Sequence, residues 1–340
     1  MAETIQLTRK DFVSSQDVRW CPGCGDYAIL SVIQKLMPEL GIPKEDILFI
    51  SGIGCSSRFP YYMNTYGFHT VHGRAPSFAS GAKVSNPDLS VWLITGDGDG
   101  LSIGGNHLLH TLRRNLNMQI LLFNNRIYGL TKGQYSPTSK EGTKAKTTPD
   151  GSIDHPVCPA TFALGSGATF VARTVDTDLK HMAMVFKRAA EHPGAAFVEI
   201  LQNCVIFNDK EWDEIEDKKT RPDVALKLEH GKALAWGSPG KRKGIKMRNG
   251  IVSIVDLADD DDPAEKGIRI HDEQMPTPGY ATILSSFTRP DYPMPIGVLR
   301  AVESSVYEDD LIGQIDAAKE QRGEGTLENL LYSGDTWTVE

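Results

Sequence analysis

The stretch SVWLITGDGDG, residues 90–100, joins an apolar run to a turn made of glycine and aspartate. A second stretch, MQILLFNNRIYGL at 118–130, repeats the arrangement with two asparagines in the turn. Apolar runs of this length without polar alternation are typical of strands buried on both faces of a sheet. The two stretches therefore predict two strands, each followed directly by polar side chains.

Three more apolar runs predict strands of the same kind: 46–51, 168–173 and 195–200. Helical patterns lie between the runs: 26–37, 103–115 and 178–191. Strands that alternate with helices are typical of a doubly wound α/β fold with a mainly parallel sheet. Because ligands of such folds bind beyond the carboxyl ends of the strands, we expect the functional motifs to follow the strands.

The bulk composition argues against several classes of protein. With 340 residues, 40% of them apolar, the chain is long enough to bury one large core or two modest ones. Its net charge of -8 argues against a nucleic-acid surface, which needs a basic face. The start MAETIQLTRKDF lacks an apolar signal region, and no apolar run is long enough for a bilayer. Five cysteines are too few for a disulfide scaffold. We expect a soluble, cytoplasmic protein, with no nucleic-acid or membrane partner.

Two of the predicted strands end in side chains that carry oxygen ligands, Asp97 and Asn125. The glycines beside them let the backbone approach a phosphate closely. Mg²⁺ is usually held by one or two protein oxygens together with phosphate oxygens. Two ordinary turns are the alternative, since Gly, Asp and Asn are common in turns. The two motifs together favour a site for magnesium and a diphosphate.

Cys21 and Cys24 stand three apart in VRWCPGCGDYAILS, residues 18–31. Such a pair is found in redox dithiols, in zinc sites and in iron-sulfur sites. Thiolates suit both zinc and iron-sulfur clusters, so the ligand type alone does not decide between the metals.

GDG at 96–98, 25 intervening residues and NN at 124–125 resemble the diphosphate-binding signature of thiamine diphosphate enzymes. The resemblance implies a sheet of the thiamine diphosphate-binding type. It also implies that Mg²⁺ is held by Asp97, Asn125 and the carbonyl of Ile127. Several classes of enzyme share this signature, so it indicates the cofactor but not the reaction.

Four further motifs resemble the beta subunit of 2-oxoacid:ferredoxin oxidoreductases, most of all the 2-oxoglutarate type. The motifs are CPGC at 21–24, SGIGCSSR at 51–58, HGRA at 72–75 and YGLTKGQYSPTS at 128–139. The likeness covers at least residues 18–210. It implies one 4Fe-4S cluster held by four cysteines: Cys21, Cys24, Cys55 and Cys204. Zinc has no redox chemistry, so an electron-transfer role favours iron. Cys158 is left over and is expected to be a structural thiol.

The same resemblance implies the roles of further residues. Contacts with thiamine diphosphate are expected from nine of them: Ile53, Gly54, Cys55, His72, Gly96, Gly98, Asp99, Gly129 and Leu130. His72 and Arg58 are expected to act in catalysis. A guanidinium can meet a carboxylate with two parallel hydrogen bonds, so we expect Arg58 to bind the second carboxylate of 2-oxoglutarate. The alternative is that Arg58 forms an internal salt bridge or contacts the partner chain.

The implied reaction is the reversible, coenzyme A-dependent oxidative decarboxylation of 2-oxoglutarate to succinyl-CoA and carbon dioxide. Electrons pass through the cluster to ferredoxin. The chain offers no second alternating domain for the glutamate that activates the cofactor. We therefore expect it on a separate alpha subunit, in an alpha2beta2 heterotetramer. The alternatives are a pyruvate or broad-specificity 2-oxoacid:ferredoxin oxidoreductase and a non-catalytic zinc-binding module.

The composition changes after about residue 209, where charged, basic and acidic segments follow one another. We expect a thiamine diphosphate and iron-sulfur cluster-binding domain at 1–210. Residues 211–340 are expected to form a C-terminal extension or arm, packed over the core or a neighbouring subunit.

Overall fold

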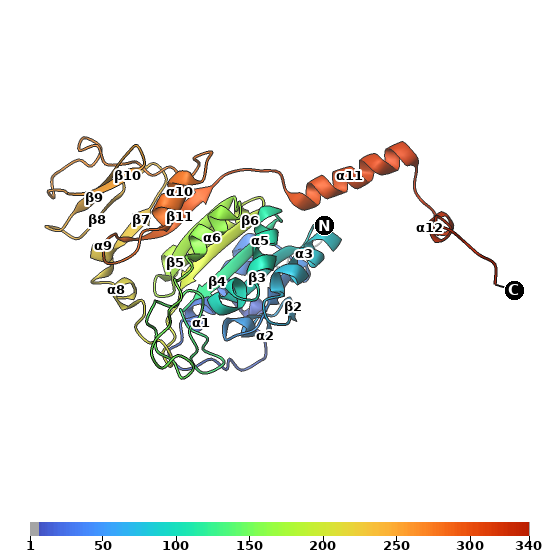
Figure 1. Ribbon diagram of the computed structural model, residues 1–340, viewed down its shortest axis with the longest axis horizontal. Coiled ribbons are helices and arrows are strands. Elements are labelled where there is room, and N and C mark those ends of the chain that lie inside the picture. Colours follow the sequence, from blue (N-terminus) through green and yellow to red (C-terminus); the bar gives the residue numbers. More distant parts are fainter. Residues whose placement is uncertain (1–6, 340) are drawn as a thin grey trace.

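The computed structural model describes residues 7–339 and shows an eight-stranded sheet with helices on both faces (Figure 1). The strand order is β2-β1-β3-β4-β6-β5-β11-β7, and β10-β9-β8 form a separate small sheet. The strands are β1 Ile47–Ser51, β2 Tyr66–His69, β3 Ser90–Gly96, β4 Met118–Asn124, β5 Phe170–Val175, β6 Ala195–Leu201, β7 Ala225–Leu228, β8 Ala235–Trp236, β9 Lys243–Arg248, β10 Ile251–Asp256 and β11 Met294–Ala301.

Twelve α-helices accompany the strands within the described residues. They are α1 Asp26–Leu40, α2 Phe59–Tyr62, α3 Ala75–Ser85, α4 Asp97–Leu101, α5 Gly105–Arg113, α6 Pro159–Gly165, α7 Leu179–Glu191, α8 Asp213–Glu216, α9 Arg221–Val224, α10 Gly279–Ser285, α11 Tyr307–Arg322 and α12 Leu327–Leu331. None of them is long and apolar enough to cross a membrane.

The predicted doubly wound α/β fold is confirmed. The five predicted strands correspond to β1, β3, β4, β5 and β6, each within two residues of the expected bounds, and all five run parallel. Every residue of β4 and β6 is buried, which explains why these strands appear in the sequence as uninterrupted apolar runs. The three predicted helices are α1, α5 and α7.

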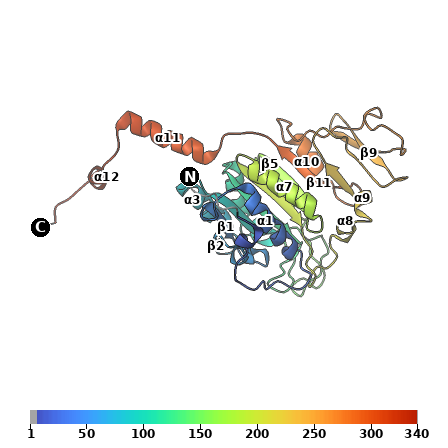
Figure 2. The same cartoon turned by 180° about the vertical axis from the view of Figure 1, so that it is seen from behind.

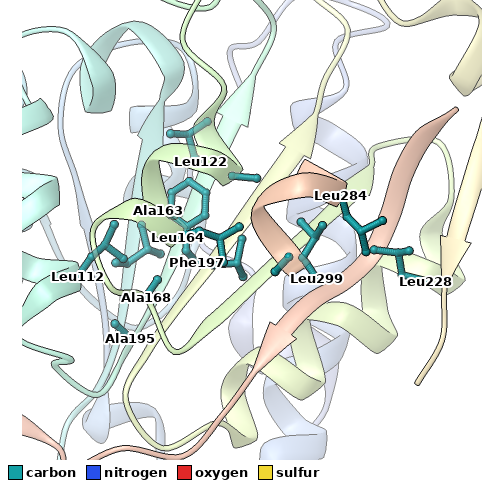
Figure 3. Packing of buried hydrophobic residues seen from close by; sticks show 14 of the residues in the cluster. Leu112, Leu122, Ala163, Leu164, Ala168, Ala195, Phe197, Leu228, Leu284 and Leu299 are labelled. Carbon is teal, nitrogen blue, oxygen red and sulfur yellow. The ribbon is translucent and has the colours of Figure 1, made fainter. Parts of the chain in front are cut away.

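Each face of the sheet has its own apolar core. On one face, Ile33 of α1 and Phe186 of α7 pack over Trp92 and Val198 of the sheet. On the other face, α3, α5, α6 and α10 cover the sheet. Figure 3 shows part of this second core, in which Leu164 and Leu284 lie with Leu122, Phe197 and Leu299 of the strands.

The parallel strands place their carboxyl ends at one edge of the sheet. β3 and β4 are neighbours, with Gly96 paired to Phe123, so the motifs that follow them begin side by side. β6 lies next to β4 and leads into the segment that carries Cys204. This edge therefore collects the turns after four strands, β1, β3, β4 and β6.

Two strands beyond residue 210 belong to the main sheet. β11 pairs antiparallel with β5, and β7 pairs parallel with β11 at the end of the sheet. The domain boundary at residue 210 remains a prediction, and a unit that ended there would lack these two strands. The small sheet β8–β10 lies outside the main sheet (Figure 1).

The last two helices form an arm that projects from the body, as both views show (Figures 1 and 2). Only the start of α11 is tied to the body: the carboxylate of Glu308 accepts a hydrogen bond from the backbone of Asn117 and lies 3.8 Å from Lys83 Nζ. Residues 309–339 are otherwise almost entirely exposed, including Trp337 at 84%.

Candidate functional site

A cavity of about 480 Å³ opens at the carboxyl edge of the sheet, over β1, β3 and β4. Nine of its lining residues are the predicted cofactor contacts: Ile53, Gly54, Cys55, His72, Gly96, Gly98, Asp99, Gly129 and Leu130. Three more are the predicted magnesium ligands: Asp97, Asn125 and Ile127. The fold thus brings together all twelve residues, although they are spread over four segments of the chain.

Asp99 organises the loops around the cavity. Its Oδ1 accepts hydrogen bonds from the backbone N–H of Ile53 at 3.0 Å and of Gly73 at 2.7 Å, and lies 2.7 Å from His72 Nδ1. Its Oδ2 accepts a hydrogen bond from Thr95 at 2.8 Å. A carboxylate bound by so many protein donors fixes the loops after β1 and β2 against the end of β3.

His72 is oriented by this carboxylate. A carboxylate can only accept, so Nδ1 is the donor in this pair, and in the uncharged ring Nε2 is then the acceptor. The side chain is 41% exposed at the rim of the cavity. His72 can therefore accept a proton or a hydrogen bond from a molecule in the cavity.

Asp97 stands at the start of α4 and is buried, with 2% exposure. Ser136 and Thr138 each donate a hydrogen bond to its Oδ2 at 2.5 Å. Burial raises the pKa of Asp97 to about 6 although both hydrogen bonds oppose the shift. No Lys, Arg or His forms an ion pair with it within residues 7–339. A cation bound beside this carboxylate would compensate its buried charge.

Asn125 and Ile127 face the same space from the turn after β4. The side-chain oxygen of Asn125 accepts a hydrogen bond from Ile127 N at 3.2 Å, and its Nδ2 donates to Gln202 at 2.9 Å. An amide oxygen has two lone pairs, so the bond from Ile127 leaves it one further acceptor position. Oxygens from Asp97, Asn125 and Ile127 could hold one hard cation.

Gly98 is required by the close approach of Tyr128. The Tyr128 hydroxyl donates to the carbonyl of Gly98 at 2.8 Å, and a Cβ on Gly98 would overlap the tyrosine ring. The same ring lies 6.2 Å from the ring of His72. Tyr128 therefore forms one wall of the cavity.

Cys24, Cys55 and Cys204 lie near one another at the cavity, and Cys21 is joined to Cys24 through the backbone. A methyl group on Gly129 would lie 3.5 Å from Cys204 Sγ and 3.6 Å from Cys55 Sγ, so these two sulfurs are at most about 7 Å apart. Cys24 Sγ accepts a hydrogen bond from Gln202 at 3.3 Å, and the backbone of Cys24 is bonded to that of Cys21. Cys55 is close enough to Cys21 and Cys204, and Cys24 to Cys55 and Cys204, for an electrostatic influence.

Burial opposes ionisation of two of these thiols. Burial and, second, nearby Asp26 raise the pKa of Cys55 to about 12, and burial raises the pKa of Cys24 strongly. Only a strong local positive charge, such as a bound metal provides, would favour thiolates here. No three His, Cys, Asp or Glu side chains of residues 7–339 are grouped to hold a single metal ion.

Cys158 and Arg58 lie elsewhere. Cys158 is near Arg173 and the carbonyl of Ser285, away from the other four thiols. Arg58 lines a shallow hollow of about 350 Å³ with Arg19 and Tyr61 and does not line the cavity. It is near enough to Cys55 to lower the pKa of that thiol. Its predicted contact with substrate remains a prediction.

Several residues of the site were not predicted from the sequence. Asp26, Tyr128 and Gln202 line the cavity, and Ser136 and Thr138 bind Asp97. Ser136 and Thr138 belong to the YSPTS motif at 135–139, and Gln202 directly follows an apolar strand. The sequence therefore offered a reason to include these three residues in the site. For Asp26 it offered no reason beyond the place two residues after Cys24, and the buried Oδ1 of Asp26 has no hydrogen-bond partner.

Comparison with known proteins agrees with this geometry. Residues 52–200 match the family model of the thiamine pyrophosphate enzyme, C-terminal TPP binding domain. The chain is 51% identical to the 2-oxoglutarate oxidoreductase subunit KorB of Mycobacterium tuberculosis over 97% of this chain and 88% of that protein. It is 44% identical to the 2-oxoacid:ferredoxin oxidoreductase subunit beta of Saccharolobus solfataricus over 70% of this chain and 84% of that protein.

The chain belongs to the family of 2-oxoacid:ferredoxin oxidoreductase beta subunits.

A solved structure extends the likeness to this beta subunit's whole fold. The 2-oxoglutarate:ferredoxin oxidoreductase from Magnetococcus marinus, determined with 2-oxoglutarate, coenzyme A and succinyl-CoA bound, matches with a TM-score of 0.74 and 34% identity. The match covers 98% of this chain and 97% of that one, so it includes residues beyond the main sheet. The predicted family is confirmed, and a beta subunit implies an alpha subunit as partner.

Proposed function

We propose that the chain is the beta subunit of a 2-oxoglutarate:ferredoxin oxidoreductase. The complex would convert 2-oxoglutarate and coenzyme A to succinyl-CoA and carbon dioxide, reversibly, with ferredoxin as electron acceptor. The observation that carries the proposal is that Cys55 and Cys204 lie against Gly129, in the wall of a cavity that all twelve predicted cofactor and magnesium residues line. Gly129 lines the cavity and also lies beside Cys55 and Cys204, so the distance for electron transfer from the cofactor to the cluster would be short.

The cavity fits thiamine diphosphate with Mg²⁺. Asp97, Asn125 and the carbonyl of Ile127 would hold the ion, and the glycine-rich turns leave room for a diphosphate beside it. The buried, unpaired charge of Asp97 supports this assignment, because a cation would compensate it. His72 would contact the cofactor or substrate from the rim, held in place by Asp99.

The cysteines fit an iron-sulfur cluster better than a single zinc ion. Zinc binds sulfur at about 2.3 Å, so a zinc site needs its ligands crowded around one point. A cluster with several metal atoms spans more widely spaced sulfurs, and those of Cys55 and Cys204 lie at most about 7 Å apart; Cys21 and Cys24 would complete the set. When bound, thiamine diphosphate supplies the nucleophile and electron sink for decarboxylation, and the cluster accepts the electrons.

The deciding experiment uses the complex purified without oxygen together with its partner subunit. We expect a brown protein that contains iron, sulfide and thiamine diphosphate and reduces ferredoxin with 2-oxoglutarate and coenzyme A. A colourless protein that contains zinc and no thiamine diphosphate would support the non-catalytic zinc module instead. Since the Saccharolobus relative is named for 2-oxoacids in general, activity with pyruvate must be compared in the same assay.

Arg58 provides a test of substrate choice. If its guanidinium binds the second carboxylate of 2-oxoglutarate, Arg58→Ala should raise the Michaelis constant for 2-oxoglutarate by roughly 10- to 100-fold, the loss of one charge-assisted hydrogen bond or pair. Any activity with pyruvate should change much less. Arg19→Ala is the matched control, because Arg19 lines the same hollow and is 67% exposed. Equal effects of Arg58→Ala on both 2-oxoacids would show that Arg58 does not select between them.

The mouth of the cavity has the character of a subunit contact. Leu130 at the cavity is 50% exposed, Val71 beside His72 is 63% exposed, and Ile103 against Gly73 is 51% exposed. Exposed apolar side chains that cluster around an opening are typical of an interaction surface. The alpha subunit would cover them and supply the glutamate that activates the cofactor, in an alpha2beta2 assembly with ferredoxin docking near the cysteines.

The chain expressed without its partner should therefore show no oxidation of 2-oxoglutarate with ferredoxin or an artificial electron acceptor. Addition of the purified alpha subunit should restore turnover. Iron and sulfide content of the lone chain is the control, because it shows that the chain has folded around the cysteines. Steady turnover by the lone chain would contradict the two-subunit assignment.

A further inference from the structure

A line of buried polar side chains crosses the apolar sheet from Asp97 to β11. The line follows the sheet order β3-β4-β6-β5-β11: its first member, Asp97, directly follows β3, and each of the other four strands contributes one member. The members are Asp97, Asn124, Glu199, Arg173 and the carbonyl of Pro295, with Thr138 between the first two. None of the five side chains is more than 3% exposed.

Thr138 joins the metal-binding carboxylate to the next strand. Its hydroxyl oxygen lies 2.5 Å from Asp97 Oδ2 and 3.0 Å from Asn124 Oδ1. A threonine has a single hydroxyl proton, so the two acceptors compete for it and the position of each affects the other. Ser136 also donates to Oδ2, so both hydroxyls contact the same oxygen of Asp97 and fix the rotation of the carboxylate.

Asn124 is itself oriented by a charged pair. Its Nδ2 donates to Glu199 Oε1 at 2.7 Å, which determines that Oδ1 faces Thr138. The other oxygen of Glu199 accepts from Arg173 Nε at 2.8 Å, and Arg173 Nη1 donates to the carbonyl of Pro295 at 3.3 Å. From Asn124 to Pro295, every link of the line is therefore defined by a donor and an acceptor, and Asn124 Oδ1 also accepts from Arg126 N at 3.3 Å.

Stabilisation of the core does not explain why the ion pair of Glu199 and Arg173 is buried here. Glu199 is the one charged residue of β6, whose sequence AAFVEIL is otherwise apolar and wholly buried. A buried ion pair seldom stabilises a core more than apolar residues of the same size would. Buried polar networks with every group satisfied instead make the positions of their members unique. Side chains that ligate metals are held by such partners.

We infer that Glu199, held by Arg173, positions Asp97 for Mg²⁺ through Asn124 and Thr138. These are positioning residues, because none of the four lines the cavity. The inference rests on the proposed function, since it takes Asp97 as a ligand of the magnesium diphosphate. Through the carbonyl of Pro295, which accepts from Arg173, β11 of the C-terminal part of the chain would contribute to cofactor binding.

The test uses the complex with its partner subunit, stripped of thiamine diphosphate and magnesium by a chelator and gel filtration. Mg²⁺ is titrated at saturating thiamine diphosphate, and binding is followed by protein fluorescence. Thr138→Val removes the hydroxyl at nearly constant volume and should weaken Mg²⁺ binding about 10- to 100-fold, the usual effect of losing a residue that orients a metal ligand. Thr138→Ser keeps the hydroxyl and should bind within about twofold of the unchanged complex.

Glu199→Gln should weaken Mg²⁺ binding by a similar factor. The double variant T138V/E199Q should bind no more weakly than the poorer single variant, because both changes interrupt the same line. Glu273→Gln is the matched control: Glu273 is 5% exposed and pairs with Arg188 at 2.7 Å, but no described hydrogen bond connects it to Asp97. Its affinity for Mg²⁺ should be unchanged even if its melting temperature falls.

The outcomes separate this inference from the proposed function. Thr138→Val and Glu199→Gln that bind Mg²⁺ normally, while Asp97→Ala does not, would overturn the positioning role and leave the proposed function intact. A loss as large in Glu273→Gln as in Glu199→Gln would also overturn it, because the effect would then be one of general stability. Normal thiamine diphosphate binding by Asp97→Ala would instead contradict the proposed function itself.

Discussion

Asp97→Ala should release thiamine diphosphate from the purified complex. The substitution removes the charged ligand that balances Mg²⁺, and a residue that merely supports a ligand is already worth about 10- to 100-fold in metal affinity. We expect a loss greater than about 100-fold for Asp97, measured as the thiamine diphosphate that remains after gel filtration at low magnesium. The iron and sulfide content should stay unchanged, because the four cysteines do not depend on this carboxylate.

Two control variants distinguish loss of a metal ligand from general loss of stability. Burial raises the pKa of Asp97 to about 6, so its charge is unfavourable in the metal-free protein. Metal-free Asp97→Asn should therefore unfold at no lower temperature than the metal-free unchanged protein, although it too binds cofactor poorly. Glu273→Ala, which removes another buried carboxylate, should keep its thiamine diphosphate. Retention of the full complement of cofactor by Asp97→Ala would exclude Asp97 as a ligand.

Cys204→Ser should bleach the protein, whereas Cys158→Ser should leave its colour intact. Cys204 Sγ lies beside Gly129 and Cys55, where a cluster would bind. A serine hydroxyl does not supply the thiolate that iron requires, so the cluster should be lost or assemble poorly. The measurement is visible absorbance, with iron and sulfide analysis, on complexes purified without oxygen.

Cys158→Ser is the matched control because it makes the same chemical change at a thiol outside this group. Cys158 contacts Arg173 at 3.7 Å and the carbonyl of Ser285 at 3.3 Å, and these contacts are weak hydrogen bonds. The variant should lose about 1 kcal/mol of stability at most. The same loss of iron from both variants would show that the four-cysteine assignment is wrong.

The sequence alone predicted the centre of the fold correctly. β4 and β6 lie between other strands and under helices on both faces, so nearly every residue is apolar and the runs are easily recognised. The edge strand β2 was missed because its four residues are all exposed and carry no such run. β7 and β11 were missed because they lie in a region whose charged segments suggested an arm.

The sequence also predicted twelve of the residues that line the cavity, and topology explains why. In a parallel sheet the carboxyl ends of all strands meet at one edge, so motifs that directly follow strands must come together whatever the sequence distance between them. Asp97, Asn125 and Cys55 each follow a strand closely. The resemblance to a known family then assigned roles to these residues, which chemistry alone left open.

Only the tertiary structure revealed how the site is supported. The hydrogen bonds from Thr138 through Asn124 to Glu199 and Arg173 join residues up to 75 positions apart. They depend on the register that sets Arg173 opposite Glu199, on the order of β4, β6 and β5, and on the path of the loop that carries Thr138 back to Asp97. Apolar burial determines that a strand exists and which runs form it. The pairing of polar groups inside the core depends on the exact positions of the atoms, because a hydrogen bond is lost when its partners are displaced by about 1 Å. The sequence pattern does not determine positions to that accuracy.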